Sequence, residues 1–141
     1  IVPVKDKKKK YYTLLGWDGN DNFTTKKIID VLYFTSKDEP KFGASIFKMD
    51  RKSPKRVIFE YSNDATMSLR YEEKKNQIVF DHLSPTRDEL EGIRQYYVPD
   101  MSFDALEFLK GKWVYKPDVD VRIDKKEIPY NDPKKIKDET E

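Results

Sequence analysis

Apolar and polar side chains alternate through three consecutive segments in the middle of the chain, over residues 55–83. A two-residue period places alternate side chains on opposite faces of a β-strand. Polar turn residues separate the segments at 62–64 and 74–76. The pattern therefore predicts three antiparallel strands, which we expect to form the central meander of the fold. The alternating residues are Val57, Phe59 and Tyr61, then Met67, Leu69 and Tyr71, then Ile78, Phe80 and His82.

Similar segments lie on both sides of this meander. Asp18-Gly19, between two of them, is a strong signal for a β-hairpin. Residues 23–34 could form a short helix, but their β-branched and aromatic content favours a strand. Thr86 and Glu89 match a capping box at the start of a helical turn. Further strands are predicted over residues 1–4, 11–15, 23–34, 42–48, 93–98, 103–109, 112–115 and 119–123.

Strands that follow one another with short turns between them are typical of antiparallel folds rather than of βαβ units. We therefore predict an all-β fold, an antiparallel meander that forms a sandwich or an open barrel. The chain has 141 residues, which suits one domain. We assign residues 1–123 to this domain and residues 124–141 to a charged, proline-containing tail, which has few apolar side chains to bury.

The charge of the chain is nearly balanced, with 28 basic and 26 acidic residues and a formal net charge of +2. This balance argues against a strong attraction to nucleic acid or to anionic lipid. Residues 5–10 hold five lysines without aromatic neighbours, so we interpret them as a solvated hairpin loop. No apolar run has the length of a membrane span. Because the chain begins with Ile1 and shows no signal peptide, we expect it to be the later part of a longer chain.

His82 is the single histidine, and the chain has no cysteine. Asp81, His82 and Ser84 together suggest a hydrolase triad, but adjacent side chains on a strand point to opposite faces. Asp81 therefore cannot orient the imidazole as a triad requires. We interpret His82 as a strand-end histidine that is hydrogen-bonded to the backbone and that can respond to pH. No glycine-rich phosphate loop is present, and we predict no cofactor.

Asp18, Asn20 and Asn22 have the alternating spacing of oxygen ligands in a Ca²⁺ loop. An EF-hand loop also needs glycine at its sixth position and an acid at its twelfth, where this chain has Phe23 and Ile29. Turn chemistry alone explains the asparagines and aspartates. We therefore predict no metal site, with these three residues as the one weak candidate.

Exposed aromatic side chains are the remaining candidates for ligand binding, because their rings stack on sugars, peptides and unpaired bases. Most aromatic residues on alternating strands are expected to belong to the core. A tryptophan in a polar turn and one member of each adjacent tyrosine pair are the exceptions to expect. The candidate ligand-binding or partner-binding residues are Trp17, Tyr11, Tyr97 and Trp113.

Several segments together resemble an uncharacterised family of exported bacterial envelope proteins. They are YYTLLGWDGN, KKIIDVLYF, FGASIFK, RVIFEYS, MSLRYEE, IVFDHLSP, LEGIRQYYVPD and KGKWVYKPDVDVR, which cover most of residues 11–122. The resemblance implies an export route and a setting in the periplasm or at the outer-membrane surface. It also implies that these segments form the C-terminal part of a longer chain.

These observations lead us to expect a non-enzymatic interaction or accessory module of the bacterial envelope, as a subunit of a larger membrane-associated assembly. An unpaired sheet edge, or the tail after Asp124, would contact the partner by adding a strand. The alternative is a glycan-binding domain or glycan hydrolase. That alternative requires Trp17 or Trp113 to be exposed beside two carboxylates.

Overall fold

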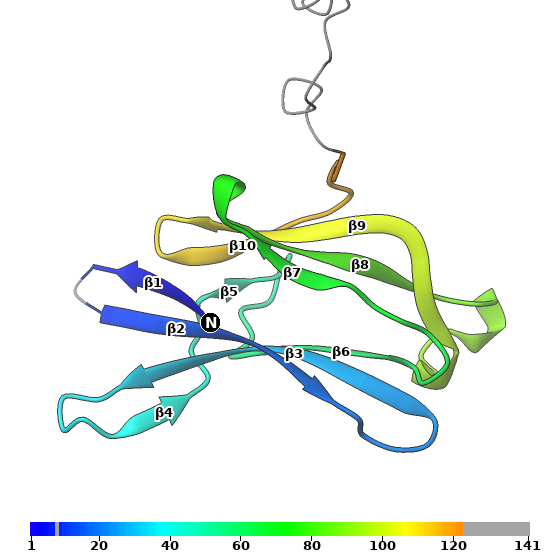
Figure 1. Cartoon of the computed structure of the whole chain (residues 1–141), viewed down its shortest axis with the longest axis horizontal. Coiled ribbons are helices and arrows are strands. Elements are labelled where there is room, and N and C mark those ends of the chain that lie inside the picture. The colour runs from blue at the N-terminus through cyan, green and yellow to red at the C-terminus, as the bar shows by residue number, and fades with distance from the viewer. Residues whose placement is uncertain (8, 123–141) are drawn as a thin grey trace, which may run out of the picture.

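The computed structural model describes residues 1–7 and 9–122. Within them, ten strands form two five-stranded sheets that pack together as two layers (Figure 1). All neighbouring strands are antiparallel except β5 and β10, which are parallel. The predicted all-β, antiparallel fold is therefore confirmed, in the form of two open sheets packed together.

The first sheet has the order β1-β2-β3-β4, and β6 also pairs with β3. Its strands are β1 (Val2–Asp6), β2 (Lys9–Asp18), β3 (Thr24–Phe34), β4 (Pro40–Phe42) and β6 (Val57–Ser62). The β2–β3 hairpin turns after Asp18, as the Asp-Gly pair predicts. The lysine-rich residues flank the connection between β1 and β2, where Asp6 pairs with Lys9.

The second sheet has the order β5-β10-β9-β8-β7. Its strands are β5 (Phe47–Lys48), β7 (Leu69–Glu72), β8 (Gln77–Pro85), β9 (Tyr97–Leu109) and β10 (Lys112–Lys116). In the described part of the chain, three 3-10 helices connect strands: η1 (Glu73–Lys75), η2 (Asp88–Leu90) and η3 (Arg94–Tyr96). In Figure 1 the long strand β9 runs along the second sheet and then bends strongly near its N-terminal end.

The predicted central meander over residues 55–83 is wrong as a single unit. Only β7 and β8 pair with each other, whereas β6 pairs with β3 in the other layer. The chain crosses between the two sheets after Ser62, and Met67 is buried in this crossing. Alternation identifies a strand and its buried face, but it does not identify the strand beside it.

Other predicted boundaries are corrected in the same way. Residues 42–48 do not form one strand, because Gly43 has a φ of 86° and ends β4. Residues 94–96 are helical, and residues 99–102, between the predicted strands 93–98 and 103–109, lie within β9. The cap of η2 is Arg87 without a side-chain hydrogen bond, so the capping box at Thr86 is wrong.

The last predicted strand and the tail have different outcomes. Residues 119–122 are not a strand, although the N–H of Val119 donates to the carbonyl of Phe103 at 2.8 Å. This hydrogen bond is a single contact and does not continue as the ladder of hydrogen bonds that defines a β-strand. The predicted tail over residues 124–141 lies outside the described residues.

Side chains from the facing surfaces of the two sheets form the core. Trp113 is fully buried, and its indole N–H donates to the hydroxyl of Thr13 at 3.0 Å. This bond joins β10 of the second sheet to β2 of the first. The rings of Phe59 and Phe80 also meet across the layers, with centroids 4.6 Å apart. Phe59 and Phe80 also line the same cleft as His82, so the apolar contacts between the sheets reach this histidine.

Candidate functional site

Three of the four predicted aromatic binding residues are buried. Trp113 has no exposed surface, and Tyr11 and Tyr97 are also buried. Tyr11 packs edge-on against Tyr33, and the hydroxyl of Tyr97 accepts the N–H of Gly92 at 2.9 Å. Because an exposed ring is needed for stacking on a ligand, the burial of these three rings does not favour the predicted binding role.

Trp17 is the predicted aromatic residue that does reach solvent, with 70% of its surface exposed. Its ring lies against Gly19, where an added Cβ would come within 3.1 Å of the indole. The tight turn therefore supports one side of the ring.

The weak Ca²⁺ candidate has the hydrogen bonds of a turn. A carboxylate oxygen of Asp18 accepts the N–H of Asn20 at 2.8 Å. The amide of Asn20 donates to the hydroxyl of Thr24 at 2.6 Å, so this side chain points along the hairpin. Asp21 accepts the N–H groups of Phe23 and Thr24, and these bonds lower the pKa of its carboxyl. The described residues contain no cluster of three or more His, Cys, Asp or Glu side chains placed to hold a metal ion.

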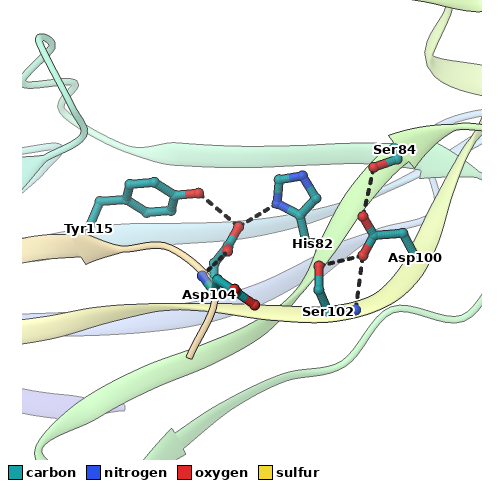
Figure 2. A network of polar contacts seen from close by, with 7 residues as sticks. His82, Ser84, Asp100, Ser102, Asp104 and Tyr115 are labelled. Carbon is teal, nitrogen blue, oxygen red and sulfur yellow. Dashed lines mark hydrogen bonds and ion pairs between the residues drawn. The ribbon is translucent and has the colours of Figure 1, made fainter. Parts of the chain in front are cut away.

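His82 lies on β8 and makes its hydrogen bond to a side chain rather than to the backbone, which corrects the prediction. Its Nδ1 is 2.6 Å from a carboxylate oxygen of Asp104, a residue of the neighbouring strand β9 (Figure 2). Asp81 instead accepts the N–H of Ser68 at 2.6 Å. Adjacent Asp81 and His82 therefore have separate partners, as strand alternation predicts.

Asp104 is the centre of a polar network at the edge of the core (Figure 2). Its side chain is buried, and it accepts three hydrogen bonds. The donors are His82 Nδ1, the hydroxyl of Tyr115 at 2.8 Å and the N–H of Asp118 at 3.0 Å. Three donors compensate the buried carboxylate, which would otherwise be costly to remove from water.

A bulge in β9 lies directly opposite His82. Asp81 pairs with Phe103 and Leu83 pairs with Pro99, so three residues of β9 stand against one residue of β8. The middle residue of the three, Met101, has a φ of 73° and 89% of its surface exposed. A bulky side chain rarely adopts this left-handed conformation. Such bulges and strained residues are common next to functional sites.

Asp100 holds the bulge in shape. Its carboxylate accepts the N–H of Ser102 at 2.9 Å and the hydroxyl of Ser102 at 2.6 Å (Figure 2). Its other oxygen accepts the hydroxyl of Ser84 at 2.9 Å, which ties the bulge to β8. These bonds, led by the hydroxyl of Ser102, lower the pKa of Asp100.

The network changes the titration of its members. The hydrogen bond to Asp104 raises the pKa of His82, burial opposes this effect, and the negative charges of Asp104 and Asp100 add to it. Burial and the hydrogen bond to Asp104 raise the pKa of Tyr115. Both groups therefore keep their protons more strongly than they would in water.

A cleft of about 190 Å³ opens beside the imidazole. One wall is the edge of β6 in the first sheet, and the other is β8 and β9 in the second. Phe59, Phe80 and Tyr115 supply aromatic surface, and the ring centroids of Phe80 and Tyr115 are 6.5 Å apart. Arg94, at the start of η3, lines the same cleft.

A second candidate surface lies on the side of the first sheet that faces away from the core. On β2, β3 and β6, the residues that alternate with the buried ones point outward, and many of them are apolar. Register aligns Tyr12, Leu32 and Phe42 across three strands, and it aligns Ile28 with Ile58. We call this set the outer apolar face; it consists of Tyr12, Leu14, Ile28, Leu32, Phe34, Phe42 and Ile58.

The outer apolar face is partly open to solvent, since three of its side chains are exposed and the other four are half-buried. Phe34 and Phe42 are 52% and 59% exposed, and Ile58 is exposed to a similar extent. Phe34 meets the ring of Tyr12 edge-on at 6.4 Å. The outward side of the second sheet is different, since it carries mostly charged and polar side chains, among them Arg70, Glu72, Gln77, Glu107 and Lys112.

Comparisons with known proteins add no further constraint. A scan against protein-family models, a search of curated proteins and a search of solved structures each returned no match. Separately, no helix in the described part of the chain is long and apolar enough to cross a membrane.

Sequence reasoning identified His82 but missed its partner. Asp104 was one carboxylate among many, and 22 residues separate it from His82. The missing information was the pairing of β8 with β9, together with the bulge that shifts its register. The outer apolar face was missed for a related reason, because the outward residues of β2, β3 and β4 form a surface only when these strands are neighbours.

Proposed function

We propose that this protein is a non-enzymatic interaction module that binds a protein partner through the outer apolar face. The observation that carries the proposal is the group of large apolar side chains, led by the exposed Phe34 and Phe42, that register aligns across β2, β3 and β4. Asp30, which pairs with Arg56, lies between this group and the Ile28–Ile58 pair. Single apolar residues are common on protein surfaces, but a contiguous patch marks an interaction site. The outward side of the second sheet also carries apolar residues, among them Leu109 and Val114, but each is paired in register with a charged residue.

The charges around the outer apolar face support a partner with an acidic rim. Lys5 pairs in register with Lys10 at one end of the face. The ammonium of Lys10 lies 5.3 Å from the ring centroid of Tyr12, which belongs to the face itself. Complementary charge at a rim guides association and selects the partner. We therefore infer a partner with an apolar centre and with carboxylates at the end that meets these lysines.

The setting of this module is proposed to be the bacterial envelope, in the periplasm or at the outer-membrane surface. The sequence segments that resemble exported envelope proteins support this part of the proposal. Fractionation of the native cells, followed by immunodetection in cytoplasmic, periplasmic and membrane fractions, tests it. Detection confined to the cytoplasmic fraction would remove the envelope from the proposal while leaving the interaction surface in place.

Site-specific photo-crosslinking tests the partner-binding face. A photoreactive phenylalanine analogue at Phe34 or Phe42 should form an adduct with a second protein in native cells. The matched control is the same analogue at Leu109, an exposed residue at the turn of the second sheet. Mass spectrometry of the adduct should identify one protein whose crosslinked segment is apolar with acidic neighbours.

Two outcomes would contradict this proposal. One is an adduct that contains only a second copy of this chain, which would make the face a homodimer interface. The other is equal crosslinking from positions 34, 42 and 109, which would indicate nonspecific contact. A change of Lys10 to Glu should also reduce the specific adduct, because it reverses the charge that faces the acidic rim.

Glycan binding remains a second candidate because of Trp17 alone. Its exposed ring, supported from one side by Gly19, has the form of a stacking surface for a sugar ring. Titration with cell-wall or polysaccharide fragments should then change the fluorescence of Trp17, and Trp17→Ala should abolish binding. An unchanged signal across a broad panel of fragments would exclude this candidate.

A further inference from the structure

The cleft beside His82 presents two donors, on His82 and Arg94, that the described residues leave available. Asp104 occupies Nδ1 of His82, and in the described part of the chain no group bonds Nε2. The guanidinium of Arg94 lies over the ring of Tyr97 at 4.4 Å. Among the described residues, no carboxylate forms an ion pair with Arg94. Both donors line the same cleft.

The acidic groups of the cleft are already engaged by neutral or local donors. Asp104 accepts three hydrogen bonds. Asp81 accepts the N–H of Ser68, and Glu60 accepts the hydroxyl of Thr24 at 3.0 Å. Each carboxylate of the cleft thus accepts at least one internal hydrogen bond, although Asp81 and Glu60 keep further lone pairs that can accept. Donor groups without internal partners favour a ligand with a negatively charged acceptor.

The rest of the cleft suits a small apolar body. Phe59, Phe80 and Tyr115 provide ring faces and edges, and Leu83 and Met49 complete the apolar lining. A volume of about 190 Å³ lies below the range of roughly 300–1,000 Å³ that accommodates drug-sized ligands. The ligand that fits is therefore of fragment size, such as an aromatic ring with a short acidic side group.

The local backbone provides an independent reason to assign a function to this place. The bulge opposite His82 keeps Met101 in a left-handed conformation although this side chain is exposed. Asp100, Ser84 and Ser102 hold that geometry with three hydrogen bonds. The distortion falls opposite His82, the residue of β8 whose imidazole lines the cleft. Strain that is maintained in this way is typical of ligand-binding and active sites.

We propose that this cleft is a binding site for a small aromatic carboxylate, with its ring against Phe59, Phe80 and Tyr115 and its carboxylate between His82 Nε2 and Arg94. Asp104 acts as the positioning residue, because it fixes the tautomer and orientation of the imidazole. This site is separate in chemistry from the outer apolar face, and Ile58 lies at the boundary between the two.

The single histidine makes this proposal directly testable by NMR. Phenylacetate, benzylamine and 2-phenylethanol share a ring and differ in charge, so they serve as the probes. At about pH 6, below the ordinary histidine pKa of about 6.5, the imidazole is mostly charged. Phenylacetate should then shift the ¹⁵N and ¹H signals of His82 in a saturable way and raise its pKa, whereas the other two probes should not.

Variants separate the two cationic contacts. His82→Gln and Arg94→Gln should each weaken phenylacetate binding about tenfold or more, which is the effect of losing one charge-assisted hydrogen bond. Arg87→Gln, at an exposed arginine outside the cleft, is the matched control and should leave binding unchanged. Phe42→Ser should also leave it unchanged, which distinguishes this site from the partner-binding face.

Three results would overturn the proposal. Stronger binding of benzylamine than of phenylacetate would show that Glu60 and Asp81 determine the charge preference. Equal binding of all three probes would reduce the site to an apolar pocket. Absence of a saturable shift with every probe would remove the ligand site altogether. Because Arg94 is exposed, its variant is informative even if His82→Gln weakens the fold.

Discussion

The two tryptophans have opposite surroundings, and this difference gives a residue-scale test of the core. Trp113 is buried and bonded to Thr13, whereas Trp17 is mostly exposed. We predict that Trp17→Phe leaves a blue-shifted emission spectrum that iodide quenches poorly. Trp113→Phe should instead leave a red-shifted emission that iodide quenches readily. Equal quenching of both variants would contradict the burial of Trp113.

His82 makes stability depend on pH in a defined direction. The hydrogen bond to Asp104 raises the pKa of the folded-state imidazole above its unfolded value of 6.5. A group with a raised folded-state pKa stabilises the fold fully below its unfolded pKa, and this contribution is lost as pH rises through the folded-state pKa. We therefore predict that the free energy of unfolding falls as pH increases from about 6.5 upward through the folded-state pKa of His82.

Urea unfolding at a series of pH values measures this dependence. His82→Gln should remove the decrease between neutral and mildly alkaline pH, since glutamine does not titrate. At acidic pH this variant should be less stable by about 1–2 kcal/mol, which is below the usual range for a hydrogen bond to a charged group because solvent screens the 43% exposed imidazole. A decrease that persists unchanged in His82→Gln would assign it to another group.

The sequence located this histidine and excluded Asp81 as its orienting residue, and both conclusions follow from strand alternation alone. Alternation could not identify Asp104, because that assignment requires the pairing of β8 and β9. Alternation also could not show that Trp113 is buried, because the residue that covers it and bonds to it, Thr13, lies on β2 of the opposite layer. The direction in which a side chain points along its own strand was therefore predictable, whereas the residue that it contacts on another strand was not.

At the scale of elements, the bulge of β9 stores strain at Met101. An L-residue in the left-handed region pays a cost of roughly 1–2 kcal/mol, which glycine avoids. Glycine loses more backbone entropy on folding, so the two effects partly cancel. We predict that Met101→Gly stabilises the protein by about 0.5–1 kcal/mol, measured as the free energy of unfolding in urea.

Met101→Ala is the control for this prediction. It removes the exposed side chain and keeps the unfavourable φ, so its stability should remain close to that of the natural chain. A destabilised Met101→Gly variant would show that the left-handed conformation is not strained here. Pro99 and Met101 gave no signal of a bulge in the sequence, and residues 99–102, left between two predicted strands, belong to the single strand β9.

The presence of most strands was predictable because alternation marks each strand by itself. The residues at which strands end were harder to predict. β3 was identified although residues 23–34 also suited a helix, because β-branched residues pack well on a pleated surface. The segment 42–48 failed because Gly43 takes a positive φ and turns the chain toward the second sheet. The pattern of apolar residues does not encode such a change of layer.

The whole molecule is a two-layer sandwich whose two outward surfaces differ. Sequence alternation gave the fold class, because half-buried strands without helices leave few alternatives. It could not give the layer of each strand, so β6 was assigned to the same meander as β7 and β8. That assignment also concealed the outer apolar face, because this face forms only when β4 and β6 pair with different parts of β3.

The asymmetry of the two outward surfaces gives the last prediction. Phe34 and Phe42 are exposed and contribute to the outer apolar face rather than to the core. Their joint replacement by serine should therefore change the free energy of unfolding by about 1 kcal/mol or less, within the ordinary range of surface substitutions. It should also strongly reduce the fluorescence of the apolar dye ANS bound to the folded protein, because the two most exposed rings of the outer apolar face are lost.

Leu109→Ser is the matched control, because Leu109 is an exposed apolar residue on the other sheet. It should leave ANS fluorescence nearly unchanged, since its surroundings are polar and no continuous patch is present. A large loss of stability in the double variant would mean that Phe34 and Phe42 support the fold itself. If stability is kept and ANS binding is lost, these rings are retained on the surface at no benefit to folding, which is the property expected of residues that meet a partner.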